Sequence, residues 1–147
     1  MDQPLPQQID LQVVTPERRV VSETVTSVSL PGRDGRLGIL PGHAPLVSEL
    51  AAGVISYEYG GKIEYVAVSG GFTEVLQGRV IVLAETAERA EEIDAGRAQR
   101  AKLRAEEHLR HGAAGDPDAE AARASLARAL VRLEAAQETP RTAAKTR

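Results

Sequence analysis

The sequence predicts an α+β protein in which an N-terminal antiparallel β-sandwich is followed by a C-terminal antiparallel two-helix hairpin. Up to about residue 87 the chain is punctuated by Gly and Pro and is rich in Val, Ile and Thr, whereas Ala, Arg, Glu and Leu dominate beyond it. Residues 1–87 carry 6 basic and 10 acidic side chains, and residues 88–147 carry 12 and 11. We therefore expect a β-sandwich over 1–87 and a helical hairpin over 88–147.

The strands are predicted from hydrophobic residues that recur at every second position. Ile9, Leu11 and Val13 alternate with polar residues, and Val28 and Leu30 alternate with serines. This period of two is typical of a strand with one buried face. Many short strands with no helix between them favour an antiparallel sandwich or barrel.

Two tight turns join further strands in the first half. Gly60–Gly61 separates two runs of alternating apolar residues, and two adjacent glycines readily adopt the positive φ values of a primed hairpin turn. A second hairpin is expected to turn near Gln77–Gly78.

The second half predicts two helices joined by a short loop. Asp94 is expected to cap the first helix, which continues to about His111 and stops at Gly112. Asp116 is expected to cap the second, with Pro117 at its first helical position and its end near Ala136. From Pro140 onward the chain is expected to be frayed.

The facing sides of the hairpin are predicted to be lined with alanine. Residues 93–136 hold fourteen Ala and five Leu, and alanine buries much less apolar surface than leucine. The stripes expected to meet are Ala98, Ala101, Ala105 and Leu109 on the first helix, and Ala119, Ala122, Leu126, Ala129, Leu130 and Leu133 on the second. Two interpretations stay open: a hairpin packed stably on the sandwich, or an arm that can detach and dock elsewhere.

Composition excludes several classes of protein. The chain has no cysteine, which excludes disulfides and thiolate zinc sites, and aromatic residues make up only 3% of it. The net charge of −3 argues against a nucleic-acid partner. The polar N-terminus does not resemble a signal peptide, and no apolar run is long enough to predict direct insertion into a membrane.

No motif predicts a catalytic site, and we expect no enzymatic activity from this chain alone. The sequence contains no P-loop, no G-x-G-x-x-G and no G-x-S-x-G. His43 stands in a Gly- and Pro-rich turn, where bonding to the backbone is the expected role. His108 and His111 are spaced to share a metal, but no third ligand is evident and a solvated helix end is the alternative.

Arginines share faces of the predicted helices. Arg97, Arg100 and Arg104 lie on one face of the first helix, and Arg128 and Arg132 lie on one face of the second. Several converging guanidinium groups suit a phosphate ligand. The alternative is that these faces are solvated, since the helical wheel places Arg128 and Arg132 opposite the leucine stripe.

Three sequence runs resemble the epsilon subunit of bacterial F-type ATP synthase, the counterpart of the mitochondrial delta subunit. They are "GRLGILPGHAPL" at 35–46, "SGGFTEV" at 69–75 and "VLAETA" at 82–87. The likeness covers about residues 8–136. It implies the same β-sandwich and helical hairpin that the periodicity predicts.

The resemblance implies a non-catalytic rotor subunit in the central stalk of a proton-translocating ATP synthase. The sandwich is then expected to bind the gamma subunit and the c-subunit ring, which couples proton flow to ATP synthesis. The hairpin is expected to inhibit ATP hydrolysis by reaching toward the alpha and beta subunits. The implied location is peripheral, at the cytoplasmic face of the bacterial plasma membrane.

The resemblance also implies candidate contact residues. Arg36, Gly38 and His43 match the segment that meets the c ring in this family, and Arg36 stands where relatives often carry an acidic residue. That departure leaves the polarity of the contact open.

No cofactor is required, but some family members bind ATP as a regulator through an I-D-x-x-R-A motif and further arginines. The matching positions are Glu88, Ile93, Asp94, Arg97, Arg104, Arg128 and Arg132. A rival hypothesis is a free-standing small-molecule binding module that uses the arginines of the hairpin and belongs to no complex.

Overall fold

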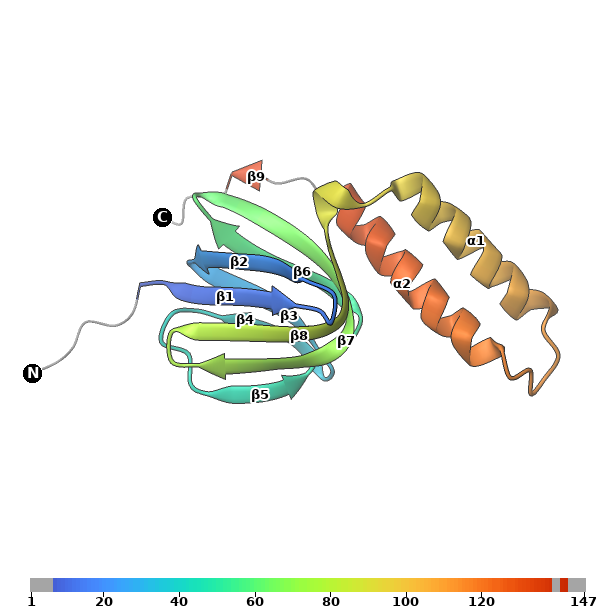
Figure 1. Cartoon of the computed structure of the whole chain (residues 1–147), viewed down its shortest axis with the longest axis horizontal. Coiled ribbons are helices and arrows are strands. Elements are labelled where there is room, and N and C mark those ends of the chain that lie inside the picture. Colours follow the sequence, from blue (N-terminus) through green and yellow to red (C-terminus); the bar gives the residue numbers. More distant parts are fainter. Residues whose placement is uncertain (1–6, 139–140, 143–147) are drawn as a thin grey trace, which may run out of the picture.

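A computed structural model describes residues 7–138 and 141–142 of the chain. It has a strand-rich N-terminal half and two C-terminal helices, as the sequence predicts (Figure 1). The strands are β1 (Ile9–Val14), β2 (Arg19–Val25), β3 (Ser27–Gly32), β4 (Gly35–Ile39), β5 (Leu46–Glu49), β6 (Gly53–Tyr59), β7 (Lys62–Leu76), β8 (Arg79–Arg89) and β9 (Arg141–Thr142). A short 3₁₀ turn (Ala90–Glu92) leads into α1 (Ala95–His111), and α2 (Ala119–Gln137) follows.

The strands follow the order β2-β1-β8-β7-β6-β3-β4, and β5 and β9 also pair with β7. The first half of β7 pairs with β6, and its second half pairs with β5. The strand changes partner around Gly70 and Gly71, whose φ angles are 59° and 109°. A Cβ added at Gly71 would lie 2.0 Å from the carbonyl oxygen of Leu83, so only glycine fits there.

The core lies between the two layers of the sandwich. Inward-facing residues of β1, β2, β3, β6, β7 and β8 form one apolar cluster with Ile39 and Leu50. The predicted alternation is confirmed, because Ile9, Leu11 and Val13 are fully buried. Both predicted turns are confirmed as well: Gly60 and Gly61 connect β6 to β7, and Gly78 lies between β7 and β8, all three with positive φ.

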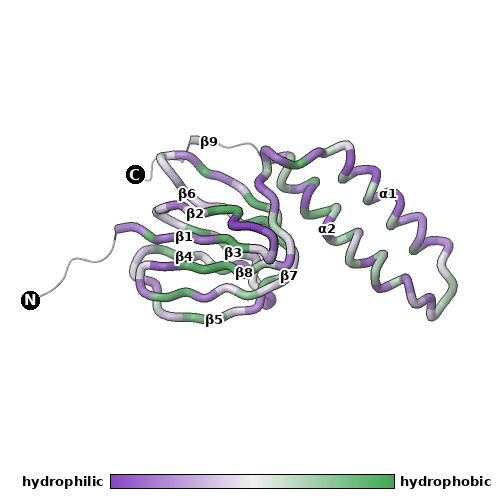
Figure 2. Tube along the Cα trace, in the orientation of Figure 1, coloured by the Kyte–Doolittle hydropathy of each residue, from purple (hydrophilic) through white to green (hydrophobic). Residues whose placement is uncertain are grey.

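The outer face of one layer is covered by α2. Val54, Tyr65 and Ala67 point away from the core and form a second apolar cluster with Val131 and Ala135 of α2. Strand β7 is therefore apolar on both faces in this region. Figure 2 shows hydrophilic and hydrophobic stretches alternating along the strands and along both helices.

The start and end of α1 agree with the sequence prediction. The Asp94 carboxylate accepts a hydrogen bond from the backbone N–H of Arg97 at 3.0 Å, as an N-cap residue does. The helix ends at His111, and the N–H of Gly112 donates to the carbonyl oxygen of His108.

The predicted start of α2 is wrong by two residues. Pro117 lies outside the helix, and Asp118 rather than Asp116 precedes its first residue, Ala119. The Asp116 carboxylate accepts from the N–H of Asp118 at 2.9 Å and lies 3.1 Å from the His108 Nε2. Asp116 therefore holds the connecting loop and does not cap α2.

The predicted stripe of α2 needs one correction. Ala129 is fully buried, but Leu130 is 46% exposed, and the next residue, Val131, is buried instead. The reason is that α2 has two neighbours, α1 on one side and the sheet on the other. A single stripe cannot describe a helix that is covered from two directions.

The frayed end predicted from Pro140 lies outside the described residues, apart from the two-residue strand β9, which pairs with β7. In the part of the chain that the structure describes, no helix has the length and apolar character needed to cross a membrane.

Candidate functional site

The candidate site lies where the start of α1 and the end of α2 meet strand β8. A hollow of about 130 Å³ is lined by Glu88, Glu92, Asp94, Arg97, Ala98 and Arg132. Four of the seven predicted nucleotide-site residues, Glu88, Asp94, Arg97 and Arg132, thus lie around one cavity. They come from three different elements, so folding of the hairpin onto the sandwich assembles the cavity.

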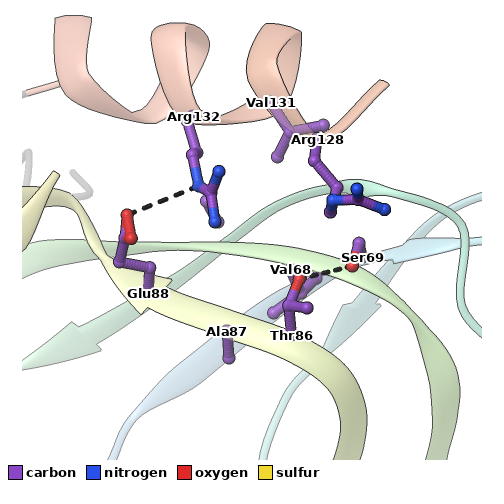
Figure 3. A pocket seen from close by; sticks show the side chains of 9 residues that line it. Val68, Ser69, Thr86, Ala87, Glu88, Arg128, Val131 and Arg132 are labelled. Atoms are coloured by element: carbon purple, nitrogen blue, oxygen red, sulfur yellow. Dashed lines mark hydrogen bonds and ion pairs between the residues drawn. The ribbon is translucent and has the colours of Figure 1, made fainter. Parts of the chain in front are cut away.

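A second, smaller hollow of about 40 Å³ lies beside the first, between α2 and the sheet (Figure 3). Arg128, Val131 and Arg132 of α2 line one side of it. The opposite side includes Ser69 of β7 and Thr86 of β8, whose hydroxyl groups are hydrogen-bonded to each other. Glu88 lines both hollows, and its carboxylate lies 3.6 Å from the Arg132 Nε.

Arg128 and Arg132 face the sandwich because the side of α2 opposite its leucines is the side that meets the sheet. Their position between helix and sheet argues against the solvated-face alternative, and binding of a ligand stays a prediction. Both arginines are half-buried between helix and sheet and not on a solvated face. Within the residues that the structure describes, Arg128 makes no hydrogen bond or ion pair with another side chain, so its guanidinium can serve a ligand.

Ile93 and Arg104 have other surroundings. Ile93 is partly buried and packs against the apolar cluster under α2. Arg104 lies about 10 Å further along α1 than Arg97, since each helical residue advances about 1.5 Å. It lines a hollow at the far end of the hairpin together with His108, His111 and Asp116.

The charges around the larger hollow are mixed. Three carboxylates and two guanidinium groups line it. The Glu92 carboxylate is already paired, because Arg18 of the β1–β2 connection donates a hydrogen bond to it at 2.8 Å and lowers its pKa. Arg89 donates to the carbonyl oxygen of Val20 at 3.0 Å. These two contacts hold the connection to α1 against the sandwich.

This arrangement can bind a ligand but contains no nucleophile positioned by a base. Guanidinium groups suit anionic oxygens, and the neighbouring carboxylates accept from hydrogen-bond donors. Among the described residues, no group of three His, Asp or Glu side chains could hold a metal ion. The His108 Nε2 lies 3.1 Å from an Asp116 carboxylate oxygen. Within the described chain, His108 and His111 belong to no group of three side chains that could hold a metal ion.

The predicted contact residues lie on β4 and in the turn that follows it. Arg36 folds back over the sheet and donates to the Ser29 hydroxyl at 2.8 Å and to the Val54 carbonyl oxygen at 2.6 Å. Gly38 is exposed, and no atom of the described residues lies within 4 Å of where its Cβ would be. The His43 Nδ1 lies 2.7 Å from the carbonyl oxygen of Ala44, which confirms its expected contact with the backbone.

One surface was not predicted from the sequence. On the outer face of the sandwich, Val47 of β5, Phe72 of β7 and Leu83 of β8 are 71%, 58% and 57% exposed. Phe72 and Leu83 are paired across the strands and border a hollow of about 410 Å³. We call these three residues the exposed apolar face. Its signal was present in β7, where Phe72 alternates with the buried Thr73 and Val75.

Two family models match the chain, and they divide it between them. The β-sandwich domain of the ATP synthase delta/epsilon chain matches residues 8–90. The long α-helix domain of the same chain matches residues 91–137.

Individual proteins show the same likeness. The ATP synthase epsilon chain of Desulforamulus reducens is 50% identical over 86% of this chain and 96% of its own length. That of Solibacter usitatus is 47% identical over 90% and 98%.

Solved structures agree. A chain in the mitochondrial ATP synthase of Euglena gracilis, described as OSCP/F1/c-ring, has a TM-score of 0.78 and 28% identity, covering 94% of this chain and 86% of that one. A chain from the central stalk/c-ring of Tetrahymena thermophila ATP synthase has a TM-score of 0.58 at 11% identity, which supports the fold alone.

Proposed function

Because this chain belongs to the ATP synthase delta/epsilon family, as an epsilon subunit of the central stalk, we propose that it is a non-catalytic coupling and regulatory part of the rotor. The sandwich binds the gamma subunit and the c ring, and the hairpin restrains ATP hydrolysis by reaching the alpha and beta subunits. The complex is attached to a bacterial plasma membrane, with this subunit at its cytoplasmic face.

The observation that carries the regulatory part is the small contact between hairpin and sandwich. On the hairpin side, Val131 and Ala135 are the buried residues of α2 in the cluster against the sheet. Their burial contributes about 2–3 kcal/mol. This contact energy is smaller than the differential affinity of about 5.5 kcal/mol that moves an equilibrium from 1:99 to 99:1. A ligand or a neighbouring subunit that prefers the released hairpin can therefore shift it.

Truncation of the hairpin tests the restraint on hydrolysis. The chain should end after Glu92, which keeps all of β8 and the pairs that Arg18 and Arg89 make. We expect the complex to assemble with this variant and its ATPase activity to rise. Unchanged ATPase activity in the assembled complex would contradict inhibition by the hairpin and leave only the coupling role.

The exposed apolar face supports the gamma subunit as a partner, because contiguous exposed apolar residues mark protein contacts. Phe72→Asp places a charge at its centre and should prevent co-purification with gamma. Leu103→Asp is the matched control, since Leu103 is also exposed but lies on α1. A Phe72→Asp variant that still travels with gamma would exclude this face. If the unmodified chain does not co-purify with gamma, the result would favour the rival hypothesis of a free-standing small-molecule binding module.

The arginines at the end of α2 support ATP as a regulatory ligand. We propose that Arg97, Arg128 and Arg132 bind its phosphates while the hairpin is folded on the sandwich. Isothermal titration of the full chain should show binding that Arg132→Ala abolishes. Arg104→Ala is the control, because Arg104 lies about 10 Å along α1 from Arg97 and lines a different hollow, and it should leave the affinity unchanged. Absence of heat at millimolar ATP would end this part of the proposal.

A further inference from the structure

Tyr65 is buried between the sheet and α2. It lies on β7, opposite Ser56 of β6, and its side chain points away from the sandwich core. It belongs to the apolar cluster that contains Val131 and Ala135, and only 7% of it is exposed. The ring therefore forms part of the surface on which α2 is docked.

No polar group of the described residues compensates the Tyr65 hydroxyl for this burial. Its oxygen is inaccessible to solvent, and within the described residues it has no hydrogen-bond partner. A buried hydroxyl without a partner loses its hydration and gains nothing in return. Val131 and Ala135 of α2 pack in the same cluster as the Tyr65 ring, so we expect water to reach the hydroxyl and the penalty to be relieved when the helix leaves the sheet.

We infer that Tyr65 is a built-in destabiliser of the docked hairpin that keeps the docked and released states within reach of each other. This inference rests on the proposed regulatory function and adds the residue that sets its balance. A phenylalanine would supply the same ring packing without the unpaired hydroxyl. The penalty for one such group corresponds to a factor of about 5 to 150 in an equilibrium constant.

The absence of cysteine from the chain provides an assay for docking. Ala67→Cys places a single thiol on the face of β7 that α2 covers, and its alkylation rate reports release of the helix. Val66→Cys places the thiol on the opposite face, in the sandwich core, and its rate reports global unfolding. In the full-length chain we expect the thiol at position 67 to react faster than the thiol at position 66.

Tyr65→Phe in the Ala67→Cys background should slow alkylation by about 5- to 150-fold. Tyr59→Phe is the matched control and should leave the rate unchanged, because Tyr59 is exposed near the end of β6. An unchanged or faster rate with Tyr65→Phe would overturn the inference. A water molecule hydrogen-bonded to the hydroxyl would produce that result.

The two thiols separate this inference from the function on which it rests. If position 67 reacts faster than position 66 but Tyr65→Phe does not slow it, the hairpin is releasable and only the role of Tyr65 fails. If both positions react at the same rate, the hairpin does not leave the intact sandwich, and both the switch and the role of Tyr65 are overturned.

Discussion

Replacing Val131 with Ala tests whether the docked hairpin is held by the face of α2 that contacts the sheet. Val131 is buried in the cluster with Tyr65 and Ala135. The substitution removes two methyl groups, which costs about 1.6 kcal/mol at about 0.8 kcal/mol per buried carbon. Because Ala is a better helix former than Val, the helix itself is not weakened. The released state should therefore become about 15-fold more populated.

The thiol at Ala67→Cys measures this change, since its alkylation follows the population of the released state. We expect alkylation to accelerate about 15-fold in Val131→Ala. Leu130→Ala is the matched control, because Leu130 is adjacent in sequence and larger, yet lies outside the cluster against the sheet. It should change the rate by less than about twofold, within the scatter expected of a surface substitution.

Equal acceleration of alkylation by Leu130→Ala and Val131→Ala would refute docking through the face of α2 that contains Val131. That result would mean that the leucine stripe predicted from the sequence docks the hairpin. Equal acceleration at Val66→Cys would mean that Val131→Ala destabilises the whole chain and not the docked helix alone.

Three further predictions concern the folding of the chain. Gly71→Ala should destabilise the sandwich by at least about 2 kcal/mol in urea unfolding, because Gly71 has positive φ and its Cβ would collide with β8. Arg18→Ala should reduce stability slightly near about pH 7 and have no effect near about pH 2. The Glu92 pKa is lowered from 4.5 in the folded chain by its hydrogen bond with Arg18, so this stabilisation is complete above 4.5 and is lost as pH falls through the lower folded value. Asp94→Ala removes the N-cap of α1 and should lower the free energy of unfolding, measured by thermal unfolding, by about 1 kcal/mol. Asp118→Ala removes no capping hydrogen bond and should lower it less.

Local features of the fold could be predicted because short-range chemistry decides them. The turn at Gly60–Gly61 needs positive φ, and the cap at Asp94 needs a carboxylate within reach of the N–H of Arg97. The start of α2 could not be predicted in the same way. Asp116 and Asp118 are both plausible caps, and the contact with His108 of the other helix engages the first of them.

The candidate site was predicted only in part. The resemblance pointed to seven residues, of which the structure gathers Glu88, Asp94, Arg97 and Arg132 around one hollow. Arg128 lies in the adjoining hollow, and Arg104 lies elsewhere. The hydroxyl pair of Ser69 and Thr86 and the exposed apolar face were not predicted, because both depend on how β5, β7 and β8 pair with one another.

By itself the sequence determined the division into a β half and a helical half, because periodicity and turn chemistry act over a few residues. It also determined which side chains share a face of each helix, since that follows from 3.6 residues per turn. Only the tertiary structure decided what covers each face: the side of α2 with Arg128, Val131 and Arg132 meets the sheet, α2 also packs against α1, and Leu130 of the predicted stripe is left exposed. Such choices depend on contacts between distant segments, such as Arg18 with Glu92, which are 74 residues apart. No local pattern encodes them.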